Sequence, residues 1–402
     1  MSHRPGRLIC LLTIICVAAA SGRAIAEGPT NQPASKVSFK RRQLDAKFRS
    51  EGVAVGDFNK DGQMDIAAGS VWYQGPDWTM HAVEDTPKAF DPKNYSNSFV
   101  NFAEDVNGDG WADLMVVDFP SKPTWWFENP RGSAGPWKRH MATPVTNNES
   151  PQFLDVDGDG RRELIMAFSP DPDDPDGPER RMAIVRRDAD ADKPWIVHPI
   201  SAKAAPGTRR YSHGLGAGDI NGDGRDDIVV TQGWWESPVK AAPGEWTFHN
   251  VDFGPAAAQM FVYDFDGDGD NDVLSSSAHN YGIWWHEQLP AGAWTTHVIL
   301  KSFSQTHGMC MADINGDGLP DFVTGKRWWA HGGKDPGGND PAVFYWFELK
   351  CAGGRPQWIA HQFDDNSGPG TQFEVADVNG DGLLDVVSSN KKGVHYFEQV
   401  RR

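Results

Sequence analysis

The sequence predicts an all-β chain folded as a seven-bladed β-propeller with four strands in each blade. Three features carry this prediction: an acidic nine-residue motif that occurs seven times, a short apolar run after each motif, and recurring aromatic–acid and Trp-x-x-His segments. The first aspartates of successive motifs lie 48, 50, 64, 45, 49 and 64 residues apart, and repeats of this period are typical of propellers and solenoids. The 43 glycines and 28 prolines among 402 residues also favour turns over long helices.

The N-terminal residues have the pattern of a signal peptide. Arg4 and Arg7 precede an apolar run over 8–20, and Ala24-Ile25-Ala26 follows as a small-x-small cleavage site. A run of this length is too short for a hydrocarbon core of about 30 Å. We therefore expect a signal peptide over 1–26 cut after Ala26, a short mature segment over 27–36, and the propeller over 37–402. The mature protein is then secreted or periplasmic and has no membrane span; the alternative is an uncleaved membrane anchor.

The charge balance argues against one class of partner. The formal net charge is −17, whereas nucleic-acid binding requires a basic surface that neutralises phosphates. We expect no nucleic-acid partner.

Each repeat begins with an Asp-x-Asp/Asn-x-Asp-Gly-x-x-Asp/Glu loop, whose chemistry favours calcium. Oxygens at places 1, 3, 5 and 9 supply the hard ligands that Ca²⁺ prefers, and the glycine at place 6 permits a sharp turn. Up to seven structural Ca²⁺ sites are therefore predicted. The predicted ligands are Asp57, Asn59, Asp61, Asp65, Asp105, Asn107, Asp109, Asp113, Asp155, Asp157, Asp159, Glu163, Asp219, Asn221, Asp223, Asp227, Asp264, Asp266, Asp268, Asp272, Asp313, Asn315, Asp317, Asp321, Asp377, Asn379, Asp381 and Asp385.

The motif has two alternative interpretations. The first is a set of Asx turns that join strands without metal. The second is an EF-hand or a dockerin-like loop, which needs an acid at the twelfth place and a following helix. The twelfth places include Ala68 and Val116, within apolar runs such as 66–68 and 114–117. Short β-branched runs beside glycine-rich turns predict strands, so the helical alternative is excluded.

The remaining strands of each blade follow in order. A short apolar strand such as 53–56 precedes the loop, and the apolar run follows it. The third strand carries an aromatic–acid segment such as Trp125-Trp126-Phe127-Glu128, and the fourth carries Trp-x-x-His such as Trp137/His140. Six histidines share this fourth-strand place, so we interpret them as structural. The last repeat ends at 394–398 without a fourth strand, and segment 39–44 matches the missing one. The N-terminal strand is therefore predicted to close the last blade.

These loops and their flanking strands resemble FG-GAP/VCBS repeats, the calcium-loop propeller repeats also found in integrin α-subunits. The resemblance covers nearly all of residues 37–399 and implies a propeller with bound calcium. A narrower resemblance links the segments 303–308 (Phe-Ser-Gln-Thr-His-Gly) and 325–331 (Gly-Lys-Arg-Trp-Trp-Ala-His) to the propeller portion of aldos-2-ulose dehydratase and its bacterial relatives. That resemblance implies a sugar-active lyase.

Candidate site residues lie on the rim away from the calcium loops. His213 and His307 occupy the same place at the entry of their innermost strands, and Glu51 takes that place in blade one. His279 follows a second strand and ends on the same rim, and the exit of a second strand in blade six carries Lys326 and Arg327. His331 is a further candidate ligand-binding residue, on the long segment 330–341. The other irregular segments are 86–101, 169–181 and 201–212, and long loops on a rigid scaffold often carry sites.

Two classes of function remain open. The first is an exported, calcium-stabilised binding module that presents its axial rim to a carbohydrate or a protein. The second is a carbon–oxygen lyase or dehydratase acting on a keto-sugar or polysaccharide, in which His213, His279, His307, Lys326 and Arg327 are the catalytic candidates. Three neutral imidazoles also suit a divalent transition metal, or one of them acts as a base near neutral pH. The alternative is that each histidine merely hydrogen-bonds a neighbouring loop.

Overall fold

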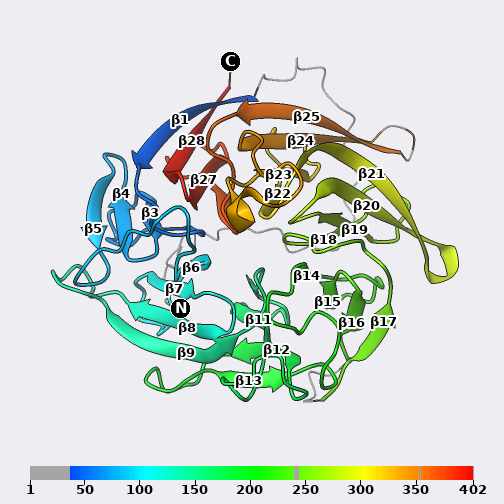
Figure 1. The fold of residues 1–402 in the computed structure, drawn as a ribbon, viewed down its shortest axis with the longest axis horizontal. Helices are drawn as coiled ribbons and strands as arrows, with labels where there is room; N and C mark the ends of the chain where they lie inside the picture. Colours follow the sequence, from blue (N-terminus) through cyan, green and yellow to red (C-terminus); the bar gives the residue numbers. More distant parts are fainter. Residues whose placement is uncertain (1–36, 240–243, 352, 354, 402) are drawn as a thin grey trace, which may run out of the picture.

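The computed structural model describes residues 37–401 apart from 240–243, 352 and 354, and its strands form seven antiparallel four-stranded sheets arranged as blades around an axis (Figure 1). The predicted signal peptide and the segment 27–36 lie outside the described residues. Two short 3-10 turns, η1 (Pro290–Gly292) and η2 (Ala330–Gly333), accompany the strands. The predicted fold class is confirmed.

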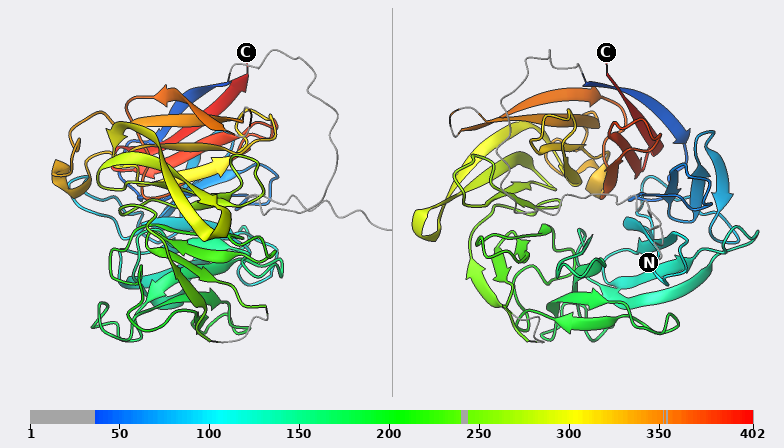
Figure 2. Two further views of the ribbon diagram at one scale, coloured as in Figure 1. Left: turned by 90° about the vertical axis from the view of Figure 1, so that its right-hand side faces the viewer. Right: turned by 180° about the vertical axis from the view of Figure 1, so that it is seen from behind.

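Every blade follows the predicted order from the innermost strand outwards. The first three blades consist of β2 (Ala54–Gly56), β3 (Asp65–Ala68), β4 (Val71–Gln74) and β5 (Thr79–Ala82); β6 (Val100–Glu104), β7 (Asp113–Val117), β8 (Lys122–Glu128) and β9 (Lys138–Thr146); and β10 (Gln152–Leu154), β11 (Glu163–Phe168), β12 (Arg181–Arg186) and β13 (Ile196–Pro199). The next three consist of β14 (Leu215–Gly218), β15 (Asp227–Val230), β16 (Gly233–Glu236) and β17 (Thr247–Asn250); β18 (Phe261–Tyr263), β19 (Asp272–Ser276), β20 (Tyr281–Leu289) and β21 (Ala293–Ser304); and β22 (Met309–Ala312), β23 (Asp321–Lys326), β24 (Val343–Cys351) and β25 (Pro356–Asp364). Figure 2 shows the hairpin of β20 and β21 projecting from the outer edge.

The last blade joins the two ends of the chain. Its inner strands are β26 (Phe373–Ala376), β27 (Asp385–Asn390) and β28 (Gly393–Arg401), and its outermost strand is β1 (Val37–Asp45). β1 pairs antiparallel with β28, from Val37 opposite Arg401 to Asp45 opposite Val394. Figure 1 shows the blue and red strands side by side. The predicted ring closure is confirmed, and it leaves no unpaired outer strand in this blade.

The ninth residue of each acidic loop fixes the loop to the blade. In blade one, Asp65 Oδ2 accepts the Phe58 N–H at 2.9 Å and Oδ1 accepts the Gly75 N–H at 2.9 Å. Asp321 accepts the N–H groups of Ile314 at 3.1 Å and Leu349 at 2.8 Å in the same way. Because these N–H groups lie in the loop and at the end of the third strand, one buried carboxylate satisfies donors that the sheet leaves unpaired.

The repeating Trp and His residues pack within the blades. The Trp234 and His249 rings stack with centroids 4.1 Å apart, and His249 Nε2 lies 2.8 Å from Glu236 Oε2. Trp126 stacks on His140 in the same way at 4.1 Å. This arrangement explains why a third-strand Trp-x-Glu sequence accompanies a fourth-strand histidine, and it confirms the structural interpretation of these histidines. No helix among the described residues is long and apolar enough to cross a membrane.

Candidate functional site

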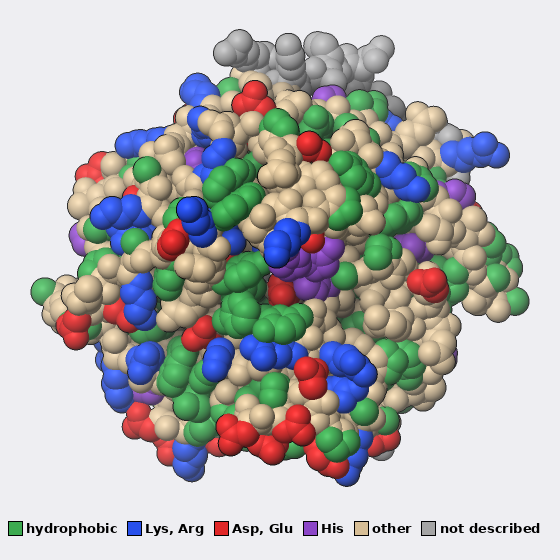
Figure 3. All heavy atoms as spheres, viewed as in Figure 1, with side chains coloured by type: hydrophobic (Ala, Val, Ile, Leu, Met, Phe, Trp, Pro, Cys, Tyr) green, Lys and Arg blue, Asp and Glu red, His purple; other side chains and the backbone are tan. Residues whose placement is uncertain are grey.

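Three histidines from neighbouring blades meet at the axis. His213 Nε2 lies 2.9 Å from His307 Nε2 and 3.1 Å from His279 Nε2. His213 precedes β14, His279 follows β19 and His307 precedes β22, so each side chain starts on the rim opposite the acidic loops. His213 and His307 are buried, at 8% and 1% exposure. Figure 3 shows histidine, acidic and hydrophobic side chains together near the centre of one face.

A carboxylate that the sequence analysis missed completes this group. Glu149 Oε2 lies 3.1 Å from His307 Nε2 and 3.2 Å from His213 Nε2. Glu149 stands six residues before the first Asp of its own loop, the same offset as His213, His307 and Glu51. That shared offset was the signal in the sequence that would have found it. We call His213, His279, His307 and Glu149 the axial cluster.

Hydrogen bonds behind the cluster set the orientation of two imidazoles. His213 Nδ1 lies 2.6 Å from the Tyr211 carbonyl oxygen, which can only accept, so Nδ1 donates. His279 Nδ1 lies 3.3 Å from Asp335 Oδ2, and we assign the proton to Nδ1 there as well. The Nε2 lone pairs of both rings then face each other across 3.1 Å. Two lone pairs at that distance repel, and a cation between them removes the repulsion.

The distances within the cluster suit a small metal ion. Zinc–ligand bonds of about 2.0–2.1 Å place tetrahedral ligand atoms roughly 3.3 Å apart, and the closest contacts here are 2.9–3.2 Å. Asp335 and the Tyr211 carbonyl supply the outer-shell acceptors that metal-binding histidines normally use. Nitrogen-rich ligand sets of this kind favour transition metals over calcium.

Burial and neighbouring charges shift the pKa values of the cluster. Burial lowers the pKa of His307 well below its usual value, and the nearby Arg327 adds to this effect. Burial also lowers the pKa of His279 to about 4. For Glu149, burial acts to raise the pKa, but His213 and His307 outweigh it, so the pKa falls well below the ordinary value. The His279 and His307 imidazoles are therefore neutral near neutral pH, and Glu149 is ionised.

Of the other predicted site residues, His331 lies next to the axial cluster and Lys326 does not. His331 Nδ1 lies 3.0 Å from Asp335 Oδ1, and its ring stacks on His279 at 4.6 Å. Lys326 does not join the group. It is fully buried, and its ammonium donates to the carbonyls of Arg327 at 3.2 Å and Gly338 at 3.4 Å, so it supports the loop after η2 rather than the pocket edge where we expected it.

Glu51, Arg327 and Lys391 form a second buried charged group beside the cluster. All three residues are at most 7% exposed. Both carboxylate oxygens of Glu51 lack a hydrogen-bond partner among the described residues. Burial raises the pKa of Glu51 above its ordinary value, although Arg327 and Lys391 oppose this. The Lys391 ammonium lies 4.1 Å from the centre of the Tyr95 ring.

The acidic loops contain carboxylate groups suited to a hard cation. Asp264, Asp266 and Asp272 bring ligand oxygens within 4.8 Å of one another, and so do Asp155, Asp157 and Glu163. Asp155 Oδ1 is buried with no hydrogen-bond partner among the described residues, as expected of an atom that faces a cation. In the other five loops, an asparagine replaces the carboxylate at the third place, and in three of them a basic side chain pairs with a loop carboxylate. The chemistry of these donors fits calcium.

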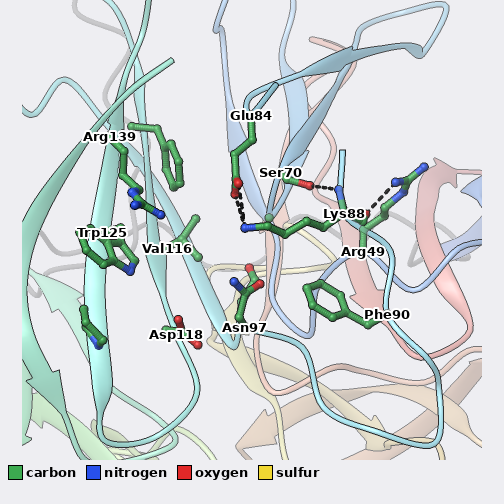
Figure 4. Close-up of a pocket in the computed structure, with 14 residues that line it drawn as sticks. Arg49, Ser70, Glu84, Lys88, Phe90, Asn97, Val116, Asp118, Trp125 and Arg139 are labelled. Carbon is green, nitrogen blue, oxygen red and sulfur yellow. Dashed lines mark hydrogen bonds and ion pairs between the residues drawn. The ribbon is translucent and has the colours of Figure 1, made fainter. Parts of the chain in front are cut away.

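A separate cavity of about 190 Å³ lies between blades one and two (Figure 4). Lys88 crosses it to Glu84 at 2.7 Å, and the Arg139 guanidinium lies 4.3 Å from the centre of the Trp125 ring. Asp118 lies on the opposite wall from Lys88, and burial raises the pKa of its carboxyl group. None of the axial-cluster residues lines this cavity.

Comparisons with known proteins agree with the repeat and the fold. An FG-GAP-like repeat model matches residues 105–166 and 264–324, and an FG-GAP repeat model matches 213–236. No curated protein sequence matched the chain. The BBS1N–ARL6DN complex has a TM-score of 0.50 at 11% identity, over 88% of this chain and 93% of that chain.

Two further solved structures are similar at lower scores. An Agrocybe aegerita lectin with specific recognition of non-reducing terminal N-acetylglucosamine has a TM-score of 0.44 at 15% identity, over 91% of this chain and 85% of that chain. The Bacillus licheniformis rhamnogalacturonan lyase has a TM-score of 0.42 at 15% identity, over 92% of this chain and 74% of that chain. The chain therefore carries FG-GAP repeats at 105–166, 213–236 and 264–324, within a seven-bladed β-propeller.

Proposed function

We propose that this protein is a calcium-stabilised propeller that holds a divalent transition metal in the axial cluster and binds a small carbohydrate through it. One observation carries the proposal: His213, His279 and His307 bring ligand atoms within 4.8 Å of one another. Their Nε2 atoms lie 2.9 Å (His213–His307) and 3.1 Å (His213–His279) apart, and Glu149 Oε2 lies 3.1 Å from His307 and 3.2 Å from His213. A metal there binds oxygen-rich ligands, and the buried charges of Arg327 and Lys391 supply hydrogen-bond donors beside it.

The proposal includes the acidic loops and the N-terminal pattern. Ca²⁺ in the loops would offset their negative charge and stabilise the ring by binding only the folded state. The signal-peptide pattern over 1–26 supports export, where millimolar calcium is common enough to fill weak sites. A protein ligand at the same rim is the alternative partner, and it is distinguished by whether binding depends on the axial metal.

The test begins with the metal. Mature protein stripped by a chelator and returned to calcium is titrated with Zn²⁺, and with Co²⁺, whose absorption spectrum reports nitrogen coordination. We expect one tight site in wild type and its loss in His307→Ala. The control His297→Ala removes a Trp-stacked histidine of the outer strand β21 and should leave the site intact. Equal titrations for wild type and His307→Ala would refute the axial metal site.

A second candidate function is a carbon–oxygen lyase of the dehydratase type. Glu51 favours it, because a buried carboxyl group without hydrogen-bond partners and with a pKa of about 8 suits proton transfer at the carbon next to a carbonyl, with its ionised form as the base. Arg327 lies close enough to Glu51 to stabilise the enolate charge. A metal bound in the axial cluster would supply Lewis-acid polarisation of the carbonyl.

Turnover distinguishes the enzyme from the binding module. Metal-loaded protein is incubated with keto-sugars and with uronate polysaccharides, and formation of a conjugated double bond is followed by ultraviolet absorbance. We expect Glu51→Gln to abolish turnover while ligand binding persists. Binding without turnover in wild type would leave the binding module as the function and refute the lyase.

A further inference from the structure

Three aromatic side chains stand beside the axial cluster and form what we call the aromatic wall: Tyr95, Phe119 and Tyr211. The Phe119 ring lies 5.7 Å from the Tyr95 ring and 5.7 Å from the Tyr211 ring, measured between centroids. Tyr211 is 42% exposed, and the other two are half-buried. Tyr95 and Tyr211 come from the two long blade-to-blade segments, 86–101 and 201–212, so the irregular length of these segments brings aromatic surface to the axis.

The aromatic wall contacts the histidines at both of its ends. At one end, the Tyr211 carbonyl accepts the His213 Nδ1–H at 2.6 Å. At the other end, the Tyr95 hydroxyl accepts the His331 backbone N–H at 3.2 Å, and the His331 ring stacks on His279. The His279 and His213 rings lie 4.5 Å apart. These contacts run in a closed circuit, with histidines on one side and aromatic rings on the other.

The backbone of Tyr211 is strained where its ring is exposed. Its φ is +63°, in the left-handed region that tyrosine rarely adopts. Its N–H donates to the Asn147 carbonyl at 3.0 Å, and its own carbonyl is held by His213, so both sides of the residue are fixed. The Arg210 guanidinium lies 4.5 Å from the ring centre. Glycine or asparagine would suit this backbone better, and strain retained beside a cluster of this kind indicates a role in ligand contact.

We infer that the aromatic wall binds the apolar face of a single sugar ring whose oxygen-bearing edge faces the axial cluster. A pyranose has a C–H face that packs on aromatic rings and vicinal oxygens that suit a metal. Because the contacts enclose the cluster on both sides, the ligand we infer is a free monosaccharide or the end unit of a chain and not an internal unit of a polysaccharide. This inference rests on the function proposed above and specifies its ligand.

The experiment uses zinc-loaded, calcium-bound mature protein and isothermal calorimetry with D-glucose, D-fructose and D-galacturonate. The best binder is compared with its linear hexamer and with that hexamer blocked at both ends. We expect the monosaccharide and the open hexamer to bind, and the blocked hexamer to bind at least 10-fold more weakly. Tyr211→Gly should weaken sugar binding about 10-fold, the effect of one lost stacking contact, and Tyr211→Phe should bind like wild type.

Two controls test whether a loss of sugar binding comes from the missing Tyr211 ring itself. Tyr211→Gly relieves the strained φ, so its melting temperature should not fall, and its zinc affinity should stay within about threefold of wild type because the backbone carbonyl remains. Ala291→Gly makes the same kind of change at a φ of +67° in the η1 turn and should leave sugar binding unchanged.

The outcomes separate this inference from the proposed function. Unchanged sugar affinity in Tyr211→Gly, or equal binding of the blocked and open hexamers, would overturn the role of the aromatic wall while the metal site stands. Zinc binding with no affinity for any of the three sugars would overturn the carbohydrate ligand and with it this inference. Failure to bind zinc at all would refute the axial metal site itself.

Discussion

Replacing Asp266 by asparagine should stabilise the protein without calcium and destabilise it with calcium. Asp266 is 7% exposed in the blade-five loop, and its ligand oxygen lies within 4.8 Å of those of Asp264 and Asp272. No basic side chain among the described residues forms an ion pair with this loop. Asp266 Oδ1 accepts the Asp268 N–H at 3.1 Å, and Asn221 Oδ1 does the same for Asp223 at 3.1 Å. Asparagine therefore fits the loop geometry.

The magnitude follows from Coulomb's law with the dielectric constant of water. Each carboxylate pair at this separation costs about 0.9 kcal/mol, so two pairs cost about 2 kcal/mol without metal. With Ca²⁺ about 2.4 Å from the carboxylate, the lost attraction is about 3.5 kcal/mol, which leaves a net loss of about 1.5 kcal/mol. An unfolding entropy of about 2.1 cal/mol/K per residue converts these values to shifts in melting temperature of about +2 to +3 °C in chelator and about −2 °C in calcium.

Differential scanning calorimetry in EGTA and in 5 mM CaCl₂ (about the level needed to fill weak sites) measures both shifts. The control Asp173→Asn removes an exposed carboxylate from an irregular loop and should shift both curves equally. A fall in melting temperature of the same size in both buffers for Asp266→Asn would show that the carboxylate acts only as a hydrogen-bond acceptor, and would refute calcium binding by this loop.

Three further predictions follow from other parts of the molecule. Deleting residues 37–46 removes eight paired positions between β1 and β28. At about 1 kcal/mol per hydrogen bond, this loss should lower the melting temperature by about 10 °C. A fall of less than about 2 °C would contradict ring closure by β1. Asp335→Asn should lower zinc affinity 10- to 100-fold, the usual cost of losing an outer-shell partner, and an unchanged affinity would remove Asp335 from that role. Burial lowers the pKa of His286 and His395 to about 4, below an unfolded value of about 6.5, so the unfolded state binds more protons and stability falls as pH drops through this interval. Each histidine should lower the free energy of unfolding by about 2 kcal/mol at pH 5. In urea melts, the double glutamine variant should therefore lose less of this free energy between pH 7 and pH 5 than wild type.

The fold was predictable because its information is repeated. Seven copies of one loop specify the strand order, and the missing fourth strand in the last copy specifies the closure through β1. Each copy is a local pattern in which loop and strand residues lie close in sequence. The inter-blade arrangement then follows from the number of copies, without any long-range contact having to be recognised.

The axial site was predictable only where it followed the repeat. His213 and His307 stand at one fixed offset from their loops, so strand polarity brings them together. Glu149 shares this offset, as Glu51 does, but was not among the predicted residues. Asp335 comes from an irregular loop whose path depends on tertiary contacts, such as its bond from Gln305 Nε2 at 3.0 Å. Lys326 is the last residue of β23, and sequence alone does not show that its ammonium turns into the following loop.

The pairing of β1 with β28 imposes an order on the synthesis and folding of the chain. β1 leaves the ribosome first among the strands and has no partner until β28 has been made, more than 350 residues later. At about 5–20 residues per second, this interval lasts roughly 20–70 s. During that time the six preceding blades can form, while the last blade remains open and β1 stays available to other chains as an unpaired strand. A chain cut short at any point before β28 therefore never closes its ring, so completion of the ring reports that synthesis has passed β28.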